Sequence, residues 1–537
     1  MEVYVVEWST IDLDESAGAP ANRFEIRAFG KTEDNQSVVL RIAFYPYFFV
    51  KTPGWTPARQ KLFINDCVRN FNANDAYCLP VVRKDAWGYS TAKENFVQLA
   101  FDTLKAQRTA RSRLAKTMST YEGSVDPVVR MCHVRGVSPT GWLTVSGAVG
   151  AKDRAFPNAD IEVLVPFTGI GPSSRTVPPP IVLCSWDLEV YSHNNAFPTP
   201  GIPENAVIQI ACAFQKLGAA EPYKKVVVCL HETSDVDGVE IVSCATEVDM
   251  YTEWVRVLKD ESVDIMIGWN TWQFDWSYIA GRVGVLTDDF GNEAVDLSGL
   301  GRGPDGAGES RSWELNSGAY GQNTFVLLKM PGVLDLDLMQ LTRREHKLDS
   351  YALGKVSAKF LGGETKLDLP PHKIFAKFRG TADDRADIAR YAVQDVLLPL
   401  KLFDKLHMYE NLAQMSVATC VPMDYLLSRG QQIKVFSLIL KQARTMGFVL
   451  PDDKSITIDG KFEGATVLEA KKGAFFDVIS GLDFASRKLP LSRCLIVSTK
   501  RSHAFFCSIP VHPQVVQPLL LDAHLAGKPR AAGRPSV

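Results

Sequence analysis

The chain has 537 residues, of which 46% are hydrophobic and 22% are charged, and its formal net charge is −2. This is the composition of a globular protein, and the length predicts about two to four domains. The apolar runs are shorter than the roughly 18 residues of a membrane helix. The N-terminus MEVYVVEWST lacks the basic and apolar regions of a secretory signal. We therefore expect an intracellular protein without a membrane partner.

The ten cysteines form no CxxC pair and no metal-like cluster with histidine, so we expect reduced cysteines that pack as small core residues. The near-neutral charge neither supports nor excludes a nucleic-acid partner. It hides a break in composition, because residues 487–537 contain eight Lys or Arg, six Pro and a single acid, Asp522. We expect this tail to be disordered.

The first 170 residues or so mix β-like runs, such as VYVVEW and VVLRIAFYPYFFV, with a basic helical stretch, FDTLKAQRTARSRLAKTM. The prolines of TVPPPIVL mark a boundary. Beyond it, the sequence predicts strands at IVLCSWDLEVYS, NAVIQIACAFQ, KKVVVCL and VDIMIGW, and a helix at EVDMYTEWVRVLKDE. Strands separated by helices predict an α/β sheet with helices packed on it.

Two later stretches have a different character. LSGLGRGPDGAGES, residues 297–310, predicts a flexible surface insertion, and it lacks the G-x-x-x-x-G-K-[ST] pattern of a phosphate-binding loop. From ADIARYAVQD to LLPLKLFDKLHMYE the pattern is strongly helical.

Four acids in three separated segments carry the functional signal: Asp187 and Glu189 in CSWDLEVYS, Asp275 in GWNTWQFDWSYIAGR, and Asp395 in RYAVQDVLLPL. Asp187 and Glu189 stand two residues apart on a predicted strand, so both side chains leave the same face. A D-x-E triplet also arises by chance in a chain of this composition. However, an acid pair next to the apolar run IVLCSW is costly unless a metal or partner compensates it.

Tyr391 and Asp395 are four residues apart on a predicted helix and therefore lie on one face. Alone, this pair is more often a core tyrosine and a solvated aspartate. The order D-x-E, then N-x-x-x-F-D, then Y-x-x-x-D is far more specific than any of its parts. If the segments meet, their carboxylates form a site for two Mg²⁺ ions that cleave a phosphodiester bond, with the tyrosine orienting the attacking water.

These segments resemble the Exo I, Exo II and Exo III motifs of the 3′–5′ proofreading exonuclease of family B DNA polymerases. The resemblance is greatest to the DNA polymerase delta type, including versions carried by large DNA viruses. It extends over roughly residues 1–486 through longer stretches: FYPYFFV, SVDPVVRMCHVRGVSPTGW, LTRREHKLDSYALGKVSAKFLGGETK, SRGQQIKVFSLIL and KFEGATVLEAKKGAFFDVISGLDFAS.

The resemblance implies roles for single residues. The metal-binding acids are Asp187, Glu189, Asp275 and Asp395, and Tyr391 is the water-orienting tyrosine. Asn270 and Phe274 match positions that hold the unpaired primer end. Trp272 and Phe274 are candidates for stacking on the end base, with aromatic residues of the core as the alternative. Lys347 and Arg344 are candidates for phosphate contact, with solvated basic residues as the alternative. Asp483 matches the first catalytic aspartate of polymerase motif A.

The resemblance also implies an α/β fold in five parts. These are a mixed N-terminal domain (1–175), a ribonuclease H-like 3′–5′ exonuclease domain with a sheet flanked by helices (176–405), a helical segment returning toward the N-terminal domain and palm (406–475), the start of the polymerase palm (476–486), and a divergent basic, Pro-rich tail (487–537).

After Ser486, the family pattern Leu-Tyr-Pro-Ser is replaced by Arg487-Lys488-Leu489-Pro490, and neither K-x-x-x-N-S-x-Y-G nor D-T-D-S follows. A truncation, an intron, an intein-like interruption and a gene-model error each explain this break, and the sequence does not choose among them. Because nucleotidyl transfer needs two palm carboxylates, we expect that this chain alone does not polymerise.

The leading hypothesis is a replicative, delta-like family B DNA polymerase whose complete site in this chain is the exonuclease, with two Mg²⁺ ions or Mn²⁺ in their place. The expected partners are DNA, through a single-stranded primer 3′ end, and, in a full-length form, accessory subunits or a sliding clamp. The expected location is the nucleus or a viral replication compartment. The alternative is a non-catalytic DNA-binding or assembly remnant, which the presence of all four acids and the tyrosine argues against.

Overall fold

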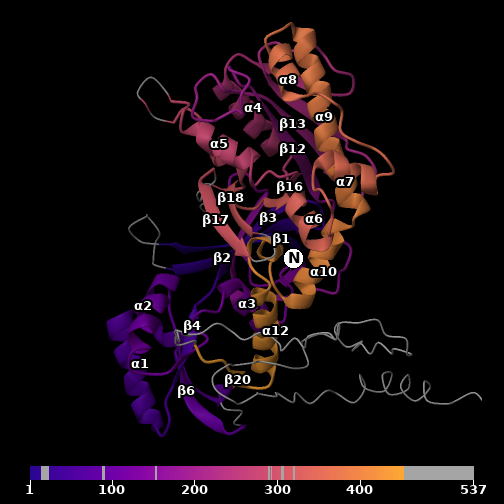
Figure 1. Ribbon diagram of the computed structural model, residues 1–537. Helices are drawn as coiled ribbons and strands as arrows, with labels where there is room; N and C mark the ends of the chain where they lie inside the picture. The colour runs from indigo at the N-terminus through magenta and orange to yellow at the C-terminus, as the bar shows by residue number, and fades with distance from the viewer. Residues whose placement is uncertain are drawn as a thin grey trace, which may run out of the picture. The chain divides into compact units, whose positions relative to one another are not determined.

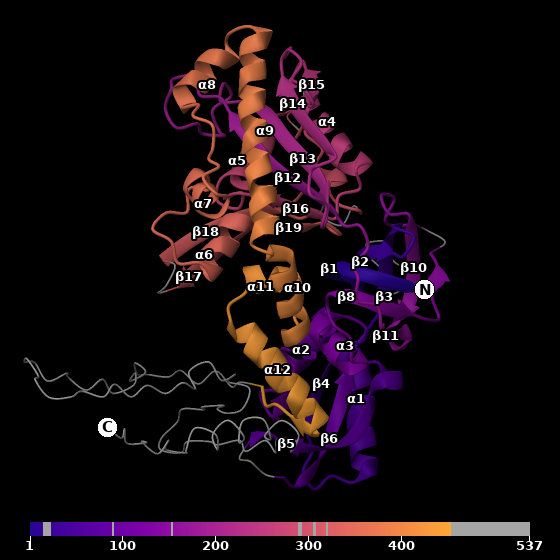
Figure 2. The ribbon, with the colours of Figure 1, turned by 90° about the vertical axis from the view of Figure 1, so that its right-hand side faces the viewer.

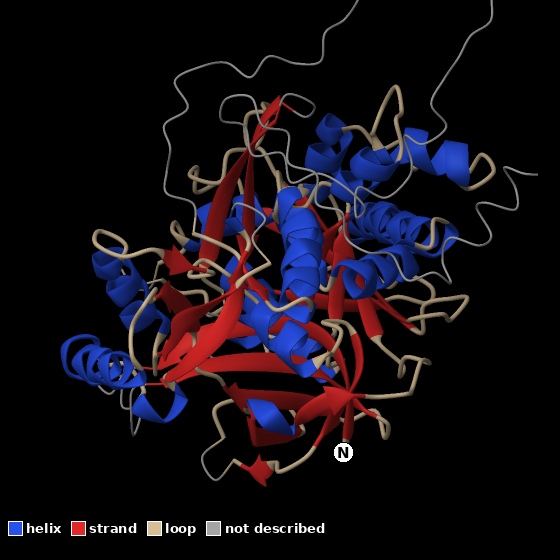
Figure 3. Cartoon of the chain, turned by 90° about the horizontal axis from the view of Figure 1, so that it is seen from below, coloured by secondary structure: helices blue, strands red, loops and turns tan. Residues whose placement is uncertain are grey.

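The computed structural model describes residues 1–13, 23–87, 91–151, 154–287, 291, 293–303, 308–317 and 321–452, with the backbone alone for 315–317 and 321–322. Asp483, the expected palm start and the basic tail lie outside the described residues. Helices and strands are interleaved through the described chain (Figure 3), so the fold is mixed α/β.

Within the described residues, strands of the N-terminal region form a seven-stranded sheet of order β11-β8-β1-β2-β3-β10-β9, of which Figure 1 labels β1, β2 and β3. β1 pairs antiparallel with β2 and β8, and β10 runs parallel to β3. The predicted β-like run VYVVEW lies in β1, and VVLRIA lies in β3. The strands are β1 (Glu2–Leu13), β2 (Arg23–Thr32), β3 (Ser37–Ala43), β8 (Gly141–Val145), β9 (Val149–Gly150), β10 (Ile161–Pro166) and β11 (Ile170–Pro172).

A five-stranded sheet of order β20-β5-β6-β4-β7 lies in the same region of the sequence. Its strands are β4 (Tyr47–Lys51), β5 (Leu79–Asp85), β6 (Lys93–Ala100), β7 (Thr120–Tyr121) and β20 (Phe448–Val449). One face packs Phe48 and Val50 against the helices α1 (Pro57–Phe71) and α2 (Leu104–Leu114). On the other face, Phe49, Phe96 and Val449, all from strands of this sheet, pack against one another. The predicted basic helix is α2, and it covers the first face together with α1.

A six-stranded sheet of order β15-β14-β13-β12-β16-β19 follows. β12, β13 and β14 are successively antiparallel, whereas β16 runs parallel to β12 and β19 runs parallel to β16. The strands are β12 (Val182–Val190), β13 (Val207–Lys216), β14 (Lys224–Leu230), β15 (Glu240–Cys244), β16 (Ile265–Gly268) and β19 (Leu334–Asp337). Each strand predicted beyond the proline boundary is confirmed in this sheet.

Helices cover both faces of the six-stranded sheet, and the alternation along β12 shows which face each covers. Trp186 packs against Trp254 of α4 (Glu247–Asp260) and Trp276 of α5 (Asp275–Val283), with ring centroids 5.4 and 4.3 Å away. The neighbouring Asp187 points to the opposite face, along which α9 (Ala382–Lys405) runs against β12 and β13 (Figure 2). α9 begins with a capping box between Thr381 and Asp384, which explains its start.

The remaining described α-helices and strands are α3 (Pro127–Arg135), the hairpin β17 (Ser310–Ser317) and β18 (Gly321–Leu328), α6 (Leu338–Glu345), α7 (Leu353–Phe360), α8 (Pro371–Phe378), α10 (Met408–Thr419), α11 (Met423–Ser428) and α12 (Gln432–Thr445). Among them, α3 packs on the seven-stranded sheet, and the others adjoin the six-stranded sheet or follow α9. α9 and α10 confirm the helical pattern predicted for ADIARYAVQD to HMYE.

The sequence of the Gly-rich stretch, residues 297–310, predicts a flexible surface insertion. This prediction is wrong for residues 300–303, which are buried. An added Cβ at Gly303 would lie 2.3 Å from the ring of Phe156, and one at Gly301 would lie 2.7 Å from Pro331. The glycines therefore serve close packing here rather than flexibility. Residues 304–307 lie outside the described residues.

Among the described residues, no helix is long and apolar enough to cross a membrane. All eight cysteines in this part of the chain are free, and seven of them are buried. The prediction of reduced cysteines in the core is confirmed for these residues.

Candidate metal centre

Three predicted acids meet where β12 faces α9. One carboxylate oxygen from each of Asp187, Glu189 and Asp395 lies within 4.8 Å of the other two, so the three could hold a metal ion. Glu189 and Asp395 are buried, whereas Asp187 is half-buried and offers an approach from solvent. Residues 187 and 189 lie on one face because the side-chain period of a strand is two.

Asp275, the fourth predicted acid, lies beside this group. It is the first residue of α5, and its Oδ1 accepts the backbone N–H of Leu188, between Asp187 and Glu189, at 3.3 Å. Its side chain is buried. The structure therefore brings all four acids to one place, although their segments are far apart in the sequence.

Lys366 completes the cluster and was not predicted from the sequence. Its ammonium forms an ion pair with Asp395 Oδ2 and lies 4.6 Å from the centroid of the Tyr391 ring. These contacts also confirm that Tyr391 and Asp395 share one face of α9. Lys366 follows α7 in a turn-rich segment without helical or strand periodicity, so no pattern marked its side chain.

The electrostatics of the cluster favour a cation. Burial is the largest cause that raises the pKa of Asp187, followed by repulsion from the neighbouring acids. Burial also raises the pKa of Glu189 to about 8 and that of Asp275 to about 7. Burial acts to lower the pKa of Lys366, but Asp395 and Tyr391 outweigh it and raise that pKa. Carboxylates that are desolvated and repel one another are stabilised by a divalent ion.

The predicted Asn270 lies in a turn directly after β16. Its backbone is in the left-handed region, with φ +67°, and its Oδ1 is buried without a hydrogen-bond partner. Asp337, at the end of β19, accepts the N–H of Asn270 at 3.1 Å and that of Trp272 at 3.3 Å. Asp337 also caps α6 by accepting the N–H of Met339 at 2.9 Å. The N-cap pattern before α6 is the signal that would have marked Asp337.

The other sequence candidates lie in different surroundings. Phe274 is half-buried, and its ring centroid lies 5.8 Å from that of the exposed Phe197. Trp272 is 3% exposed and donates its indole N–H to Asp335 at 2.7 Å, which favours the core alternative for this residue. Lys347 is exposed between α6 and α7. Arg344 donates to two backbone carbonyls of α11 and so has a structural contact.

The residues present fit a divalent metal. The clustered donors are carboxylate oxygens, the ligands that Mg²⁺ and Mn²⁺ prefer. Asp395 Oδ1 is buried without a hydrogen-bond partner, and such an orphaned acceptor is satisfied by a bound cation.

Comparison with known families gives the class of this site. Residues 118–356 match the family model "DNA polymerase family B, exonuclease domain", and residues 421–487 match "DNA polymerase family B". Together these models cover more than half of the chain, which belongs to DNA polymerase family B and contains its exonuclease domain and the start of its polymerase domain.

Individual relatives agree with this assignment. The chain is 46% identical over 486 residues to a DNA polymerase of Paramecium bursaria Chlorella virus NY2A, covering 90% of this chain and 53% of the relative. It is 31% identical over 515 residues to a DNA polymerase delta catalytic subunit of Oryza sativa, covering 90% and 45%. For the corresponding subunit of Schizosaccharomyces pombe the identity is 29% over 489 residues, covering 86% and 44%. The chain thus spans about half the length of these relatives.

A solved structure shares the fold. The structure of the family B DNA polymerase from the hyperthermophilic archaeon Pyrobaculum calidifontis matches with a TM-score of 0.61 and 20% identity. The match covers 88% of this chain and 54% of that one.

Proposed function

We propose that this chain removes nucleotides from the 3′ end of DNA by metal-dependent hydrolysis, as the proofreading part of a replicative, delta-like DNA-directed DNA polymerase. The observation that carries the proposal is the carboxylate cluster. Asp187, Glu189 and Asp395 each have one carboxylate oxygen within 4.8 Å of the other two, and Asp275 is bound to the backbone between the first two. Relatives whose names read DNA polymerase and DNA polymerase delta catalytic subunit support it.

In this proposal, Asp187, Glu189, Asp275 and Asp395 hold two Mg²⁺ ions, which Mn²⁺ can replace. When bound, such a pair of ions supplies an activated water and stabilises the leaving oxygen. Burial raises the pKa of Tyr391, so its phenol stays protonated at neutral pH and can orient the attacking water by hydrogen bonding. Lys366 balances the negative charge of Asp395.

The proposed substrate is the single-stranded 3′ end of a primer. The unpartnered Oδ1 of Asn270 is an acceptor for this strand, and Phe274 with the exposed Phe197 offers aromatic surface to the terminal base. Lys347 is exposed on the segment after α6 and is assigned to a phosphate of the same strand.

We also propose the domain division 1–175, 176–405, 406–475, 476–486 and 487–537, with a ribonuclease H-like fold for the second part. Support for that fold is the order β14-β13-β12-β16-β19, in which three antiparallel strands precede two that run parallel to β12, with helices on both faces. The first two sheets use residues below 175 apart from β20, and the six-stranded sheet uses residues above 181.

Further parts of the proposal concern the longer polymerase. Asp483 is assigned to polymerase motif A and lies within the matched residues 421–487. The proposed partners are DNA, accessory subunits and a sliding clamp, and the proposed location is the nucleus or a viral replication compartment. Relatives named DNA polymerase from a virus and DNA polymerase delta catalytic subunit from a eukaryote support these proposals. The non-catalytic remnant is not favoured, because such a remnant has no use for four acids that repel one another when no metal is bound.

The test is a matched pair of double variants on a 3′-labelled single strand with Mg²⁺. Asp187→Asn with Glu189→Gln is expected to abolish loss of the label while the circular dichroism spectrum is unchanged. The control, Asp260→Asn with Glu253→Gln, removes the same charges from the exposed surface of α4 and is expected to keep wild-type activity. Equal activity of the two double variants would remove the assignment.

A further inference from the structure

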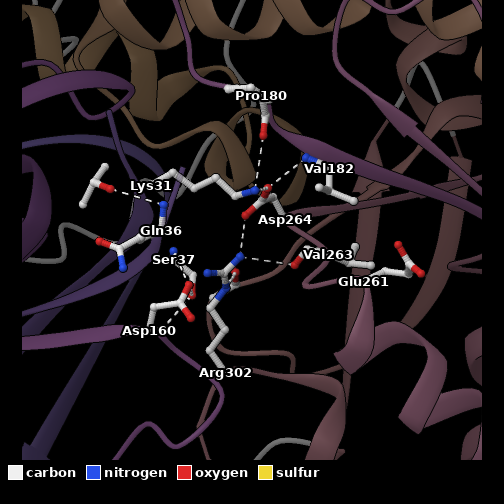
Figure 4. A network of polar contacts seen from close by, with 12 residues as sticks. Lys31, Gln36, Ser37, Asp160, Pro180, Val182, Glu261, Val263, Asp264 and Arg302 are labelled. Carbon is white, nitrogen blue, oxygen red and sulfur yellow. Dashed lines mark hydrogen bonds and ion pairs between the residues drawn. The ribbon is translucent and has the colours of Figure 1, made fainter. Parts of the chain in front are cut away.

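A buried aspartate far from the acid cluster joins the N-terminal region to the six-stranded sheet. Asp264 precedes β16 and is 1% exposed. Its Oδ2 accepts the backbone N–H of Val182 at 2.8 Å and lies 2.9 Å from Lys31 Nζ, while its Oδ1 pairs with Arg302. Figure 4 shows Lys31 and Arg302 approaching this carboxylate from two sides.

The main chain of Asp264 contacts β12, as its side chain does, and also contacts β19. Its N–H donates to Val182 O at 3.0 Å, and its carbonyl accepts the N–H of Leu334 at 2.9 Å. Val182, Ile265 and Leu334 are the first residues of β12, β16 and β19. Asp264 therefore holds together the starts of three adjacent parallel strands.

The other ends of these three strands lead to the metal centre. β12 carries Asp187 and Glu189, β16 runs into the turn of Asn270, and β19 ends at Asp337, whose carboxylate holds that turn. The pairings of Leu183 with Ile265 and of Ile265 with Leu334 fix the register of the three strands, and so the positions of their C-terminal ends relative to one another. A strand that slips by one residue turns every side chain to the other face, so a register fixed at one end positions the acids at the other.

Lys31 reaches this point from the N-terminal region. It lies near the end of β2, is 2% exposed, and donates to Pro180 O at 3.2 Å as well as pairing with Asp264. When a buried carboxylate loses one of its cations, its negative charge is no longer fully compensated. Local opening that lets water reach the carboxylate lowers the free energy of that charge. In this fold, such opening separates the starts of β12 and β16.

We propose that Lys31 and Asp264 are a positioning pair for the metal centre, through which the N-terminal region fixes the register of β12 on β16 and hence the affinity for divalent ions. This inference rests on the proposed function, because it assumes that the acids bind metal. It assigns to the N-terminal region a part in the geometry of a site to which that region contributes no ligand.

The test compares Mn²⁺ binding, measured by electron paramagnetic resonance, in wild type, Lys31→Met and Lys31→Arg. Lys31→Met is expected to fold but to bind Mn²⁺ about tenfold more weakly, at the lower end of the loss seen when support for metal ligands is removed. Amide hydrogen exchange at Val182 and Ile265 is expected to accelerate. Raising the Mn²⁺ concentration should restore the maximal exonuclease rate, and Lys31→Arg should restore the affinity.

The matched control is Lys51→Met, which removes a lysine that is ion-paired with Glu94 at 2.7 Å within the five-stranded sheet. It is expected to keep the wild-type Mn²⁺ affinity. A folded Lys31→Met protein with wild-type affinity, or an equal loss in Lys51→Met, would overturn the inference.

If Lys31→Met does not fold, the double variant Lys31→Met with Asp264→Asn takes its place, because it leaves no buried carboxylate short of a cation. It still removes the ion pair with β2, leaves Arg302 without its carboxylate partner and gives the N–H of Val182 a neutral acceptor, so the starts of β12 and β16 are again held less firmly. The expected result is again weakened Mn²⁺ binding, and wild-type binding in this double variant would overturn the inference. A wild-type protein that binds no Mn²⁺ would instead contradict the proposed function.

Discussion

Lys366 lies beside the acid cluster, where it pairs with Asp395 and lies over the ring of Tyr391. Without metal, its ammonium offsets part of the repulsion among the acids. A bound divalent ion takes over that task, so the contribution of Lys366 to stability depends on metal.

We predict that Lys366→Met destabilises the metal-free protein by about 1–2 kcal/mol, less than for a fully buried pair because the Lys366 side chain is 37% exposed. Mg²⁺ is expected to remove most of this difference. The measurement is urea unfolding with and without Mg²⁺. Lys401→Met, which breaks the exposed pair between Lys401 of α9 and Glu364, serves as the control. A loss independent of Mg²⁺ would contradict the role assigned to Lys366.

The acids could be predicted from the sequence, whereas their neighbours could not. Asp187 and Glu189 stand out because two charges in an apolar strand need compensation. Lys366 occupies a segment where a charged side chain is ordinary, and the N-cap pattern of Asp337 marks the start of a helix but not a part in this site. Only the pairing of β19 with β16 and the return of the chain to α9 bring them to the site.

At the scale of elements, the turn after β16 depends on one carboxylate at the end of β19. Asp337 accepts the N–H groups of Asn270, Trp272 and Met339 and is 0% exposed. It therefore holds Asn270 in its left-handed conformation and starts α6 at the same time.

We predict that Asp337→Ala costs about 1–2 kcal/mol, as expected for loss of an N-cap, and also weakens the binding of single-stranded DNA. Thermal unfolding and fluorescence anisotropy with a labelled strand measure the two effects. Asp126→Ala removes the N-cap of α3 and should cost similar stability with unchanged DNA binding. An equal loss of DNA affinity in both variants would show that the turn has no special part.

A second element-scale prediction concerns Glu7 of β1, which accepts the N–H of Gly332 at 3.0 Å. Burial, followed by repulsion from Asp424, raises the pKa of Glu7 to about 8, whereas glutamate in an unfolded chain titrates near 4.5. Between these values the folded state holds a proton that the unfolded state has lost. The stability from Glu7 is therefore complete below about pH 4.5 and is lost as pH rises toward 8.

Glu7→Gln is uncharged throughout this range and keeps an acceptor for Gly332. Its stability relative to wild type should rise by at most about 1.4 kcal/mol per pH unit between pH 5 and 8 and then level off. Urea unfolding at several pH values measures this difference. Parallel curves for the two proteins would show that Glu7 is ionised in the folded state.

The helices and strands predicted from the sequence are confirmed where buried residues recur at the regular spacing of a helix or a strand. The strands around Asp187 and the helix α9 could be predicted because apolar residues recur regularly. The burial of the segment around Arg302 could not be predicted, because its glycines are typical of an exposed loop. It is buried because Arg302 has an ion-pair partner elsewhere in the chain. That partner, Asp264, is 38 residues away in sequence.

At the scale of the whole molecule, the described chain is tied together across its sheets. Tyr4 of β1 hydrogen-bonds Tyr409 of α10 at 2.8 Å, and Trp142 of β8 shares a hydrophobic core with residues of the six-stranded sheet. The order of strands in the seven-stranded sheet could not be predicted, because β10 joins β3 across more than a hundred residues. Local patterns contain no information on such pairings.

Because the proposed metal ions would bind only the folded state, we predict that Mg²⁺ raises the melting temperature of the wild-type protein in a concentration-dependent way and that a chelator reverses the rise. Differential scanning calorimetry measures the shift. The variant Asp187→Asn with Glu189→Gln should melt at a temperature independent of Mg²⁺. A similar rise in both proteins would place the metal elsewhere.

Metal-dependent removal of nucleotides from a DNA 3′ end can be observed by following the products from a single strand labelled at its 5′ end, with Mg²⁺ and purified protein. We expect a ladder of products, each one nucleotide shorter at the 3′ end, together with released mononucleotides. The ladder should be absent after chelation and in the variant Asp187→Asn with Glu189→Gln. A strand that stays intact with the wild-type protein, or a ladder that persists in the double variant, would contradict the proposed function.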